Sequence, residues 1–161
     1  MRFLFMLFAS LLFLNVSADP PELNRKGKKV LEKFFDAENI ELTEVTELTS
    51  KQDIFFVAKH QDSELGIVVL TTARGRYDHF DYMMIYNNNL QLELIKILVY
   101  RSQYGSEISA KRWLRQFYQQ KDDQFKYGND IQAISGATFS AMSLTKNVNR
   151  INKKIKEHFT D

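Results

Sequence analysis

The chain contains no cysteine, only two prolines and six glycines among its 161 residues, and charges of both signs in nearly equal number. The lack of cysteine excludes disulfides, thiolate metal sites, iron–sulfur clusters, haem attached through cysteine and a lipid-modified cysteine anchor. Lys and Arg together number 22 against 20 Asp and Glu, so the charge balance gives no reason to expect nucleic acid as a partner. Any redox chemistry would therefore depend on a bound organic cofactor.

The residue types that carry metal or hydrolytic chemistry form no recognisable site. His60, His79 and His158 lie far apart in the sequence, without the spacing of metal ligands. Ser135 lacks the Gly-x-Ser-x-Gly elbow of the α/β hydrolases. The acidic residues of the middle region form no pair and are expected at the surface: Asp78, Asp81 and Glu107. The sequence therefore favours neither a metal site nor a hydrolase.

The N-terminus has the pattern of a secretory signal peptide. Arg2 precedes an apolar run over residues 3–14, and Val16-Ser17-Ala18 offers the small residues that a signal peptidase reads. Cleavage is expected between Ala18 and Asp19. The alternative is a retained membrane anchor, although the run is short of the roughly 20 residues that span a bilayer. The expected location is outside the cytoplasm, in the periplasm.

This interpretation divides the chain into a signal peptide, residues 1–18, and a single domain, residues 19–161. No second apolar stretch of spanning length follows, so no stable membrane insertion is expected after processing. The remaining 161 − 18 = 143 residues suit one domain with a hydrophobic core.

The first half of the domain reads as one helix followed by strands. Helical spacing of apolar residues predicts a helix from Pro20 and Pro21 to about Phe35. Runs rich in β-formers, separated by polar turns, then predict an antiparallel meander of four or five strands. The expected strands are an exposed stretch near 40–48 and the ranges 53–59, 66–73, 80–86 and 90–100.

The second half reads as helical. Ser109 is expected to cap a helix that ends near Gln119, and another helix is expected from Thr138 to the C-terminus. The cations of this last helix are expected on a solvated face: Lys146, Arg150, Lys153, Lys154 and Lys156. The predicted fold class is α+β, an antiparallel sheet of four to five strands with helices packed on one side.

The segment Ile134-Ser135-Gly136-Ala137-Thr138-Phe139-Ser140 opens the last predicted helix with small and hydroxyl-bearing residues. Small residues let a ligand approach the backbone, and a helix N-terminus offers unpaired N–H groups that bind phosphate. The hydroxyls of Ser135, Thr138 and Ser140 could add to that binding. The alternative is an ordinary helix start with Ser135 or Thr138 as the N-cap.

The longer run Asp130-Ile131-Gln132-Ala133-Ile134-Ser135-Gly136-Ala137-Thr138-Phe139-Ser140 resembles the C-terminal signature of the FMN-binding domain family. That family includes subunits of membrane redox complexes that pump sodium or supply electrons. The resemblance extends more loosely from residue 66 to the last helix. It implies that Thr138 carries FMN through a phosphoester, formed by a separate flavin transferase that takes FMN from FAD. Ser135, Gly136 and Ala137 would shape the turn.

Two positions depart from the family's usual pattern. Gln132 stands where the family usually has an aspartate three residues before the serine, and Asp130 is close but out of register. Residues 101–107 replace the Glu-Thr-Pro-Gly run that often precedes the middle helix. In this loop Gly105 would permit close approach to a flavin ring and Tyr104 would stack on it, unless the loop is a plain strand-to-helix turn. Gln132 leaves noncovalent FMN as an alternative to the ester.

The resemblance implies an exported flavoprotein that relays electrons. Its expected partners, both transient, are a membrane-bound redox protein and the flavin transferase. An electron carrier is preferred to an enzyme with its own substrate, because nothing in the sequence identifies a substrate pocket. The alternative is a cofactor-free exported α+β module that binds a protein or a small ligand.

Overall fold

The computed structural model describes residues 21–118 and 124–160. The expected signal peptide, residues 1–18, and the end of the predicted middle helix at Gln119 lie outside these ranges. Within them, no helix is long and apolar enough to cross a membrane.

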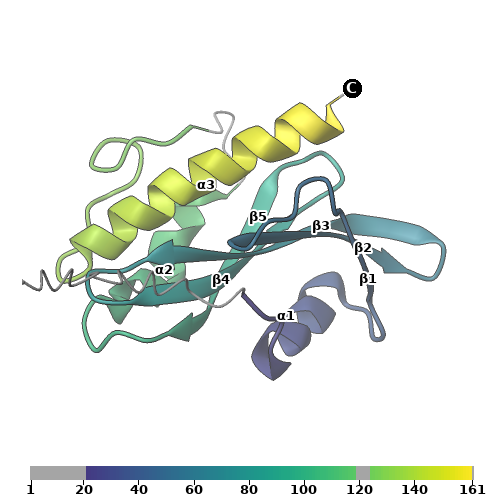
Figure 1. The fold of residues 1–161 in the computed structure, drawn as a ribbon, viewed down its shortest axis with the longest axis horizontal. Helices are drawn as coiled ribbons and strands as arrows, with labels where there is room; N and C mark the ends of the chain where they lie inside the picture. The colour runs from purple at the N-terminus through teal and green to yellow at the C-terminus, as the bar shows by residue number, and fades with distance from the viewer. Residues whose placement is uncertain (1–20, 119–123, 161) are drawn as a thin grey trace, which may run out of the picture.

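Five antiparallel strands form one sheet in the order of the chain (Figure 1). The strands are β1 (Glu41–Glu44), β2 (Asp53–His60), β3 (Ser63–Arg74), β4 (His79–Tyr86) and β5 (Leu92–Tyr100). Each neighbouring pair is antiparallel, as short connecting turns allow. The expected strand near 40–48 is shorter than predicted, because the chain leaves the sheet at Val45, whose side chain packs on the core. The α+β class and the antiparallel meander are confirmed.

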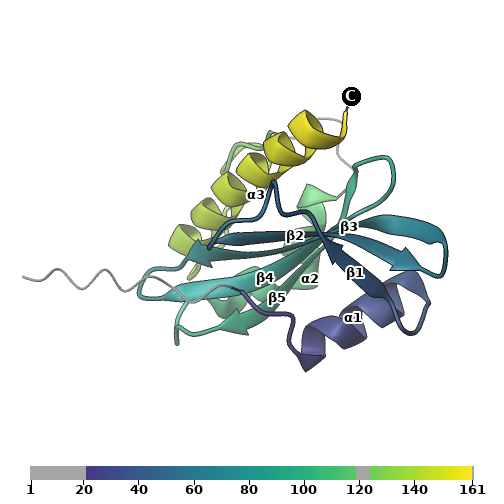
Figure 2. The same cartoon turned by 45° about the vertical axis from the view of Figure 1, so that its right-hand side comes forward.

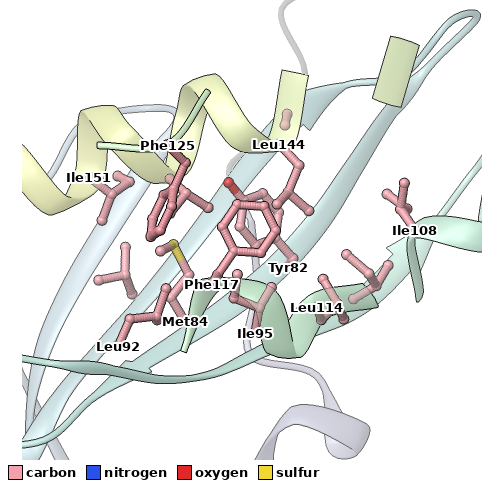
Figure 3. Close-up of a cluster of buried hydrophobic side chains, with 14 of the residues drawn as sticks. Tyr82, Met84, Leu92, Ile95, Ile108, Leu114, Phe117, Phe125, Leu144 and Ile151 are labelled. Atoms are coloured by element: carbon pink, nitrogen blue, oxygen red, sulfur yellow. The ribbon is translucent and has the colours of Figure 1, made fainter. Parts of the chain in front are cut away.

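Alternating side chains of the strands form two separate hydrophobic layers, one on each face of the sheet. Tyr82 and Met84 point into the larger layer, whereas Met83 and Ile85 point into the smaller one. Figure 3 shows the larger layer, which is filled from the opposite side by residues of the last helix, among them Leu144 and Ile151. Each face of the sheet therefore needs another element packed on it to shield its apolar side chains from water.

The helices supply that cover on both faces rather than on one. The last helix, α3 (Thr138–Phe159), and the short α2 (Lys111–Leu114) pack on the larger layer, as expected. The first helix, α1 (Arg25–Phe35), packs on the smaller layer through Leu31. Figure 2 shows α1 and α3 on opposite sides of the sheet. The expectation of helices on one side thus holds for α2 and α3, while α1 covers the face that β3 and β4 would otherwise expose.

Helix α1 begins later than the two prolines indicate. Asn24 is its N-cap, and its side-chain oxygen accepts a hydrogen bond from the backbone N–H of Gly27 at 2.9 Å. Gly27 is buried, and a Cβ there would lie 2.6 Å from Leu23 Cδ1 and in ordinary contact, at 3.5 Å, with the side chain of Leu98 on β5. The absence of a side chain at Gly27 therefore leaves room for Leu23, which packs on the smaller layer just before the helix.

The predicted middle helix is replaced by three short turns of helix. These are the 3-10 turn η1 (Ser106–Ser109), α2, and the 3-10 turn η2 (Arg115–Phe117). Ala110, not Ser109, precedes α2, and no side chain caps it. The buried residues Trp113 and Phe117 explain why apolar spacing predicted a longer helix.

The basic face of α3 is only partly solvated, because two of its cations reach a buried carboxylate. Asp53, 1% exposed, accepts two hydrogen bonds from Arg150, at 2.5 and 2.7 Å, and one from Lys154 at 3.3 Å. Asn147 donates to the Tyr82 hydroxyl at 2.7 Å. The prediction of a solvated face is wrong for Arg150 and Lys154, since a sequence does not show which carboxylate a helix will cover. This network fixes α3 on the sheet.

Candidate cofactor site at the start of helix α3

The turn that leads into α3 is shaped by backbone conformation and not by a hydroxyl cap. Gly136 adopts φ +81°, a left-handed conformation that favours glycine. Ala137 is the N-cap of α3, and no side chain bonds to the first turn. The alternative in which Ser135 or Thr138 caps the helix is therefore wrong. Thr138 is the first residue of the helix, and its hydroxyl makes only a long contact with the Ile134 carbonyl, at 3.4 Å.

The first turn of α3 consequently leaves backbone donors without partners. Within the described part of the chain, the N–H groups of Thr138, Phe139 and Ser140 make no hydrogen bond. The first such bond of the helix runs from Ala141 N to Ala137 O, at 2.9 Å. Unpaired N–H groups at a helix start, together with the positive end of the helix dipole, are the features that bind a phosphate.

A cavity of about 770 Å³ lies against this helix start. The size is within the range of small-molecule and cofactor pockets. Four large hydrophobic side chains that are half or more exposed line it, and no other described residue of that kind is so exposed: Tyr77 (69%), Tyr104 (68%), Phe139 (51%) and Met142 (52%). An exposed apolar cluster around one cavity indicates a ligand or partner surface, since single exposed residues would be scattered.

The loop after β5 is fastened to the helix start by one tyrosine hydroxyl. Tyr100 Oη donates to the Tyr104 carbonyl at 2.8 Å and lies 3.0 Å from Ser140 Oγ. Because the single phenolic hydrogen serves Tyr104, Ser140 is the donor to Tyr100. Ser140 is 2% exposed. Its hydroxyl is therefore a structural contact, and only its backbone N–H remains for a ligand.

Gly105 is needed where the loop passes the helix. It adopts φ +91°, and a Cβ there would lie 2.5 Å from Tyr100 Oη, 3.3 Å from Ser140 Oγ and 3.7 Å from Ala137 Cα. A side chain here would be strained by the left-handed φ and would displace the Tyr100 hydroxyl. The glycine thus brings Tyr104 to the edge of the cavity.

Arg76 and Tyr77 line the cavity, although the sequence pattern predicts only a polar turn at Arg74-Gly75-Arg76 between two strands. Both line the cavity from the β3–β4 connection, and the Arg76 guanidinium carbon lies 5.4 Å from the Tyr77 ring centroid. Arg76 pairs with no carboxylate among the described residues. The Tyr77 and Tyr104 rings lie 6.4 Å apart at 60°. The sequence signal for these two residues was an arginine next to a tyrosine in the connection between two predicted strands.

Three polar residues beside the motif, Asp130, Gln132 and Glu107, each have a defined contact or neighbour. Asp130 is used by its own turn, where it accepts a hydrogen bond from Lys126 N at 2.7 Å. Gln132 is held by its backbone: its carbonyl accepts from the Trp113 indole at 2.8 Å, and its N–H donates to the Gln116 side chain at 2.9 Å. A Cβ on Gly136 would lie 3.1 Å from Glu107 Oε1. Glu107 is thus the carboxylate that borders the motif.

Six of the seven residues expected at the site line one cavity. They are Tyr104, Gly105, Gly136, Ala137, Thr138 and Ser140. Ser135 is exposed and does not line it. Thr138, which is exposed at the cavity wall, is the residue whose hydroxyl a ligand can reach.

Comparison with protein families and with curated proteins identifies no relative. No protein-family model matches the chain, and a search of the curated proteins returned no match. Among the described residues, no group of three or more acidic or histidine side chains could hold a metal ion. A functional proposal therefore depends on the cavity, the residues around it and the resemblance of the motif.

Proposed function

We propose that the protein is an exported flavoprotein that relays electrons and carries FMN at Thr138. The observation that carries this proposal is the coincidence of three features at one cavity: unpaired N–H groups, a reachable threonine hydroxyl and the exposed aromatic side chains. An FMN molecule needs a binding site for its phosphate and an apolar surface for its ring. The residues present fit both requirements.

The phosphate end fits the helix start. Thr138 Oγ1 would form the ester, and the free N–H groups of Phe139 and Ser140 would donate to the remaining phosphate oxygens. Arg76, on the same cavity wall, would balance the negative charge. Gly136 keeps the backbone free of a side chain at this point, which allows a transferase to approach the hydroxyl.

The ring end fits the exposed aromatic cluster. Tyr77 and Tyr104 offer two faces against which a planar conjugated ring can pack, and Phe139 and Met142 extend the apolar surface along α3. When bound, the flavin would supply the electron-transfer chemistry, while the protein would hold and orient it. Because these side chains are on the surface, the ring would stay accessible to a docking partner.

Attachment would follow the group transfer that the family resemblance implies. The Thr138 hydroxyl would displace AMP from FAD, so that the Thr138 O–P bond would form, the pyrophosphate bond would break and the hydroxyl proton would pass to a base of the transferase. A tethered cofactor cannot dissociate outside the cytoplasm, where free FMN is scarce. Electron exchange would use a small, transient interface with a membrane-bound redox protein.

Expression with and without an exported flavin transferase tests the proposal. With the transferase we expect yellow protein whose colour stays with the chain after denaturation in acid or urea. Yellow colour that is released by denaturation would support noncovalent FMN and contradict the ester. Colourless protein in both preparations, with no binding of added FMN, would favour the cofactor-free module.

A further inference from the structure

A second and larger hollow, of about 1030 Å³, lies between α1 and the edge strand β5. Its apolar lining consists of Val30, Phe34 and Leu94. Every other lining residue is a cation: Arg25, Lys26, Lys29, Lys33, Lys96 and Lys111. We refer to these nine residues as the basic groove. No carboxylate lines it.

The six cations of the basic groove have no acidic partners. None of them forms an ion pair with a carboxylate in the described part of the chain. Burial lowers the pKa of Lys96, and the charges of Lys26 and Lys111 lower it further. The charges of Lys26 and Lys111 thus repel that of Lys96, and an anion bound between them would offset the repulsion.

A peptide could add as a further strand at the outer edge of β5, but backbone groups of this edge already form hydrogen bonds to side chains. The Tyr118 hydroxyl contacts the Ile95 N–H at 3.0 Å and the Ile95 carbonyl at 3.2 Å. Lys26 Nζ donates to the Ile97 carbonyl at 3.2 Å. An acidic peptide that recognises this edge through its backbone would have to break these bonds.

We propose that the basic groove binds an anionic phospholipid at a membrane surface. The phosphate would lie among the ammonium groups, and the upper part of an acyl chain would lie on Val30, Phe34 and Leu94. Lysine side chains suit this arrangement, because their stems cover apolar surface while their charged ends reach the headgroup. A free phosphate would leave the apolar lining unused. Lipid binding here would hold the protein at a membrane without a spanning segment.

Vesicle binding by the protein purified after export tests this inference. We compare vesicles of phosphatidylcholine alone with vesicles of equal parts phosphatidylcholine and phosphatidylglycerol, and expect binding to the mixed vesicles that weakens with added salt. The double variant Lys29→Gln/Lys33→Gln should bind mixed vesicles about tenfold or more weakly, since each basic residue near an anionic surface contributes about fivefold. Glutamine keeps the helix propensity of lysine, so α1 should persist in circular dichroism.

The matched control is Lys28→Gln/Lys153→Gln. Lys28 is an exposed α1 residue outside the groove, and Lys153 is exposed on α3, so the net charge changes equally. This variant should retain binding. Equal losses in the two double variants, no binding to mixed vesicles, or displacement by inorganic phosphate at matched ionic strength would overturn the inference. So would groove-dependent binding of polyglutamate without vesicle binding, which would assign the groove to an acidic protein.

Discussion

The hydroxyl oxygen of Tyr100 lies 3.0 Å from Oγ of Ser140, although the two residues are 40 positions apart. The contact joins the end of β5 to the first turn of α3. Through the Tyr104 carbonyl it also holds the loop that carries Gly105. The aromatic wall of the cavity and the phosphate-binding end are therefore fixed relative to each other before any ligand binds, which lowers the entropic cost of binding.

Gly105→Ala should break this arrangement. Its left-handed φ strains any side chain, and a Cβ 2.5 Å from Tyr100 Oη would force that hydroxyl out of its contacts. Gly128→Ala is the matched control, because Gly128 has φ +85° but no atom within 4 Å of the added Cβ. We expect Gly128→Ala to lower the free energy of unfolding by about 1 kcal/mol, and Gly105→Ala to lower it by about 1–2 kcal/mol more. Urea unfolding measures both. Equal losses would contradict the close approach.

Tyr104→Ala should weaken the binding of free FMN by protein made without transferase. Loss of one aromatic contact predicts a rise in the dissociation constant of about 2- to 10-fold. Tyr104→Phe, which keeps the ring, should bind almost as the parent does. Both variants should unfold within about 0.5 kcal/mol of the parent, since the side chain is mostly exposed. Titration followed by flavin fluorescence checks this, and unchanged binding in the alanine variant would remove Tyr104 from the site.

Arg76→Gln should reduce FMN affinity and make it less dependent on salt. Arg76 lines the cavity, whereas Arg74 is exposed two residues earlier and does not line it. A charge-assisted contact to phosphate predicts a loss of about 1.5–3 kcal/mol in binding free energy. Arg74→Gln should lose little. If both variants lose affinity alike, the effect is one of net charge and Arg76 has no specific role.

Acid stability should depend on Asp53. Burial alone would raise the pKa of this carboxyl, but hydrogen bonds from Arg150 and Thr71 and the charges of Arg150 and Lys154 outweigh it and lower the pKa below 3.8. A carboxyl with a lowered folded-state pKa contributes stability above its unfolded pKa and loses that contribution as the pH falls through the folded pKa. The stability that Asp53 contributes should therefore decline as the pH falls from the ordinary range of an aspartate toward its lower folded-state pKa.

The variant Asp53→Asn tests that assignment. At neutral pH it should lower the free energy of unfolding by about 2–3 kcal/mol, toward the low end for a broken buried pair because Arg150 stays partly exposed. The difference between variant and parent should shrink in acid. Asp62→Asn, in an exposed turn, should change neither the free energy of unfolding at neutral pH nor the way it falls in acid. A constant difference across the acid range would contradict the role of the Asp53 charge.

The strands could be predicted because their sequence pattern is local. Alternating apolar residues between polar turns located β2 to β5 within a few residues, and the antiparallel order followed from the short turns. The division of helices between two faces was missed. Residues such as Met83 and Ile85 are as apolar as their neighbours, so the pattern did not show that a second layer needed α1 as its cover.

The sequence predicts the part of the site that lies in one continuous segment. The part that comes from a different segment was missed. The turn at Gly136–Thr138 was identified from its small and hydroxyl-bearing residues. Arg76 and Tyr77 come from a different connection, and only the packing of β4 beside β5 and α3 brings them to the same cavity. The contact of the Ser140 hydroxyl with Tyr100 also depends on tertiary packing. The sequence therefore did not show that the Ser140 hydroxyl is occupied while the Thr138 hydroxyl is exposed.

The mass of the protein after expression with an exported flavin transferase tests the central claim most directly. Trypsin releases residues 127–146 as one peptide that contains Ser135, Thr138 and Ser140. We predict that the intact protein gains one esterified FMN and that fragmentation places it on Thr138. Ser135→Ala should keep the addition, and Thr138→Val, which keeps the side-chain shape without the hydroxyl, should lose it. Unmodified parent protein, or a Thr138→Val variant that still gains the FMN mass, would contradict the account.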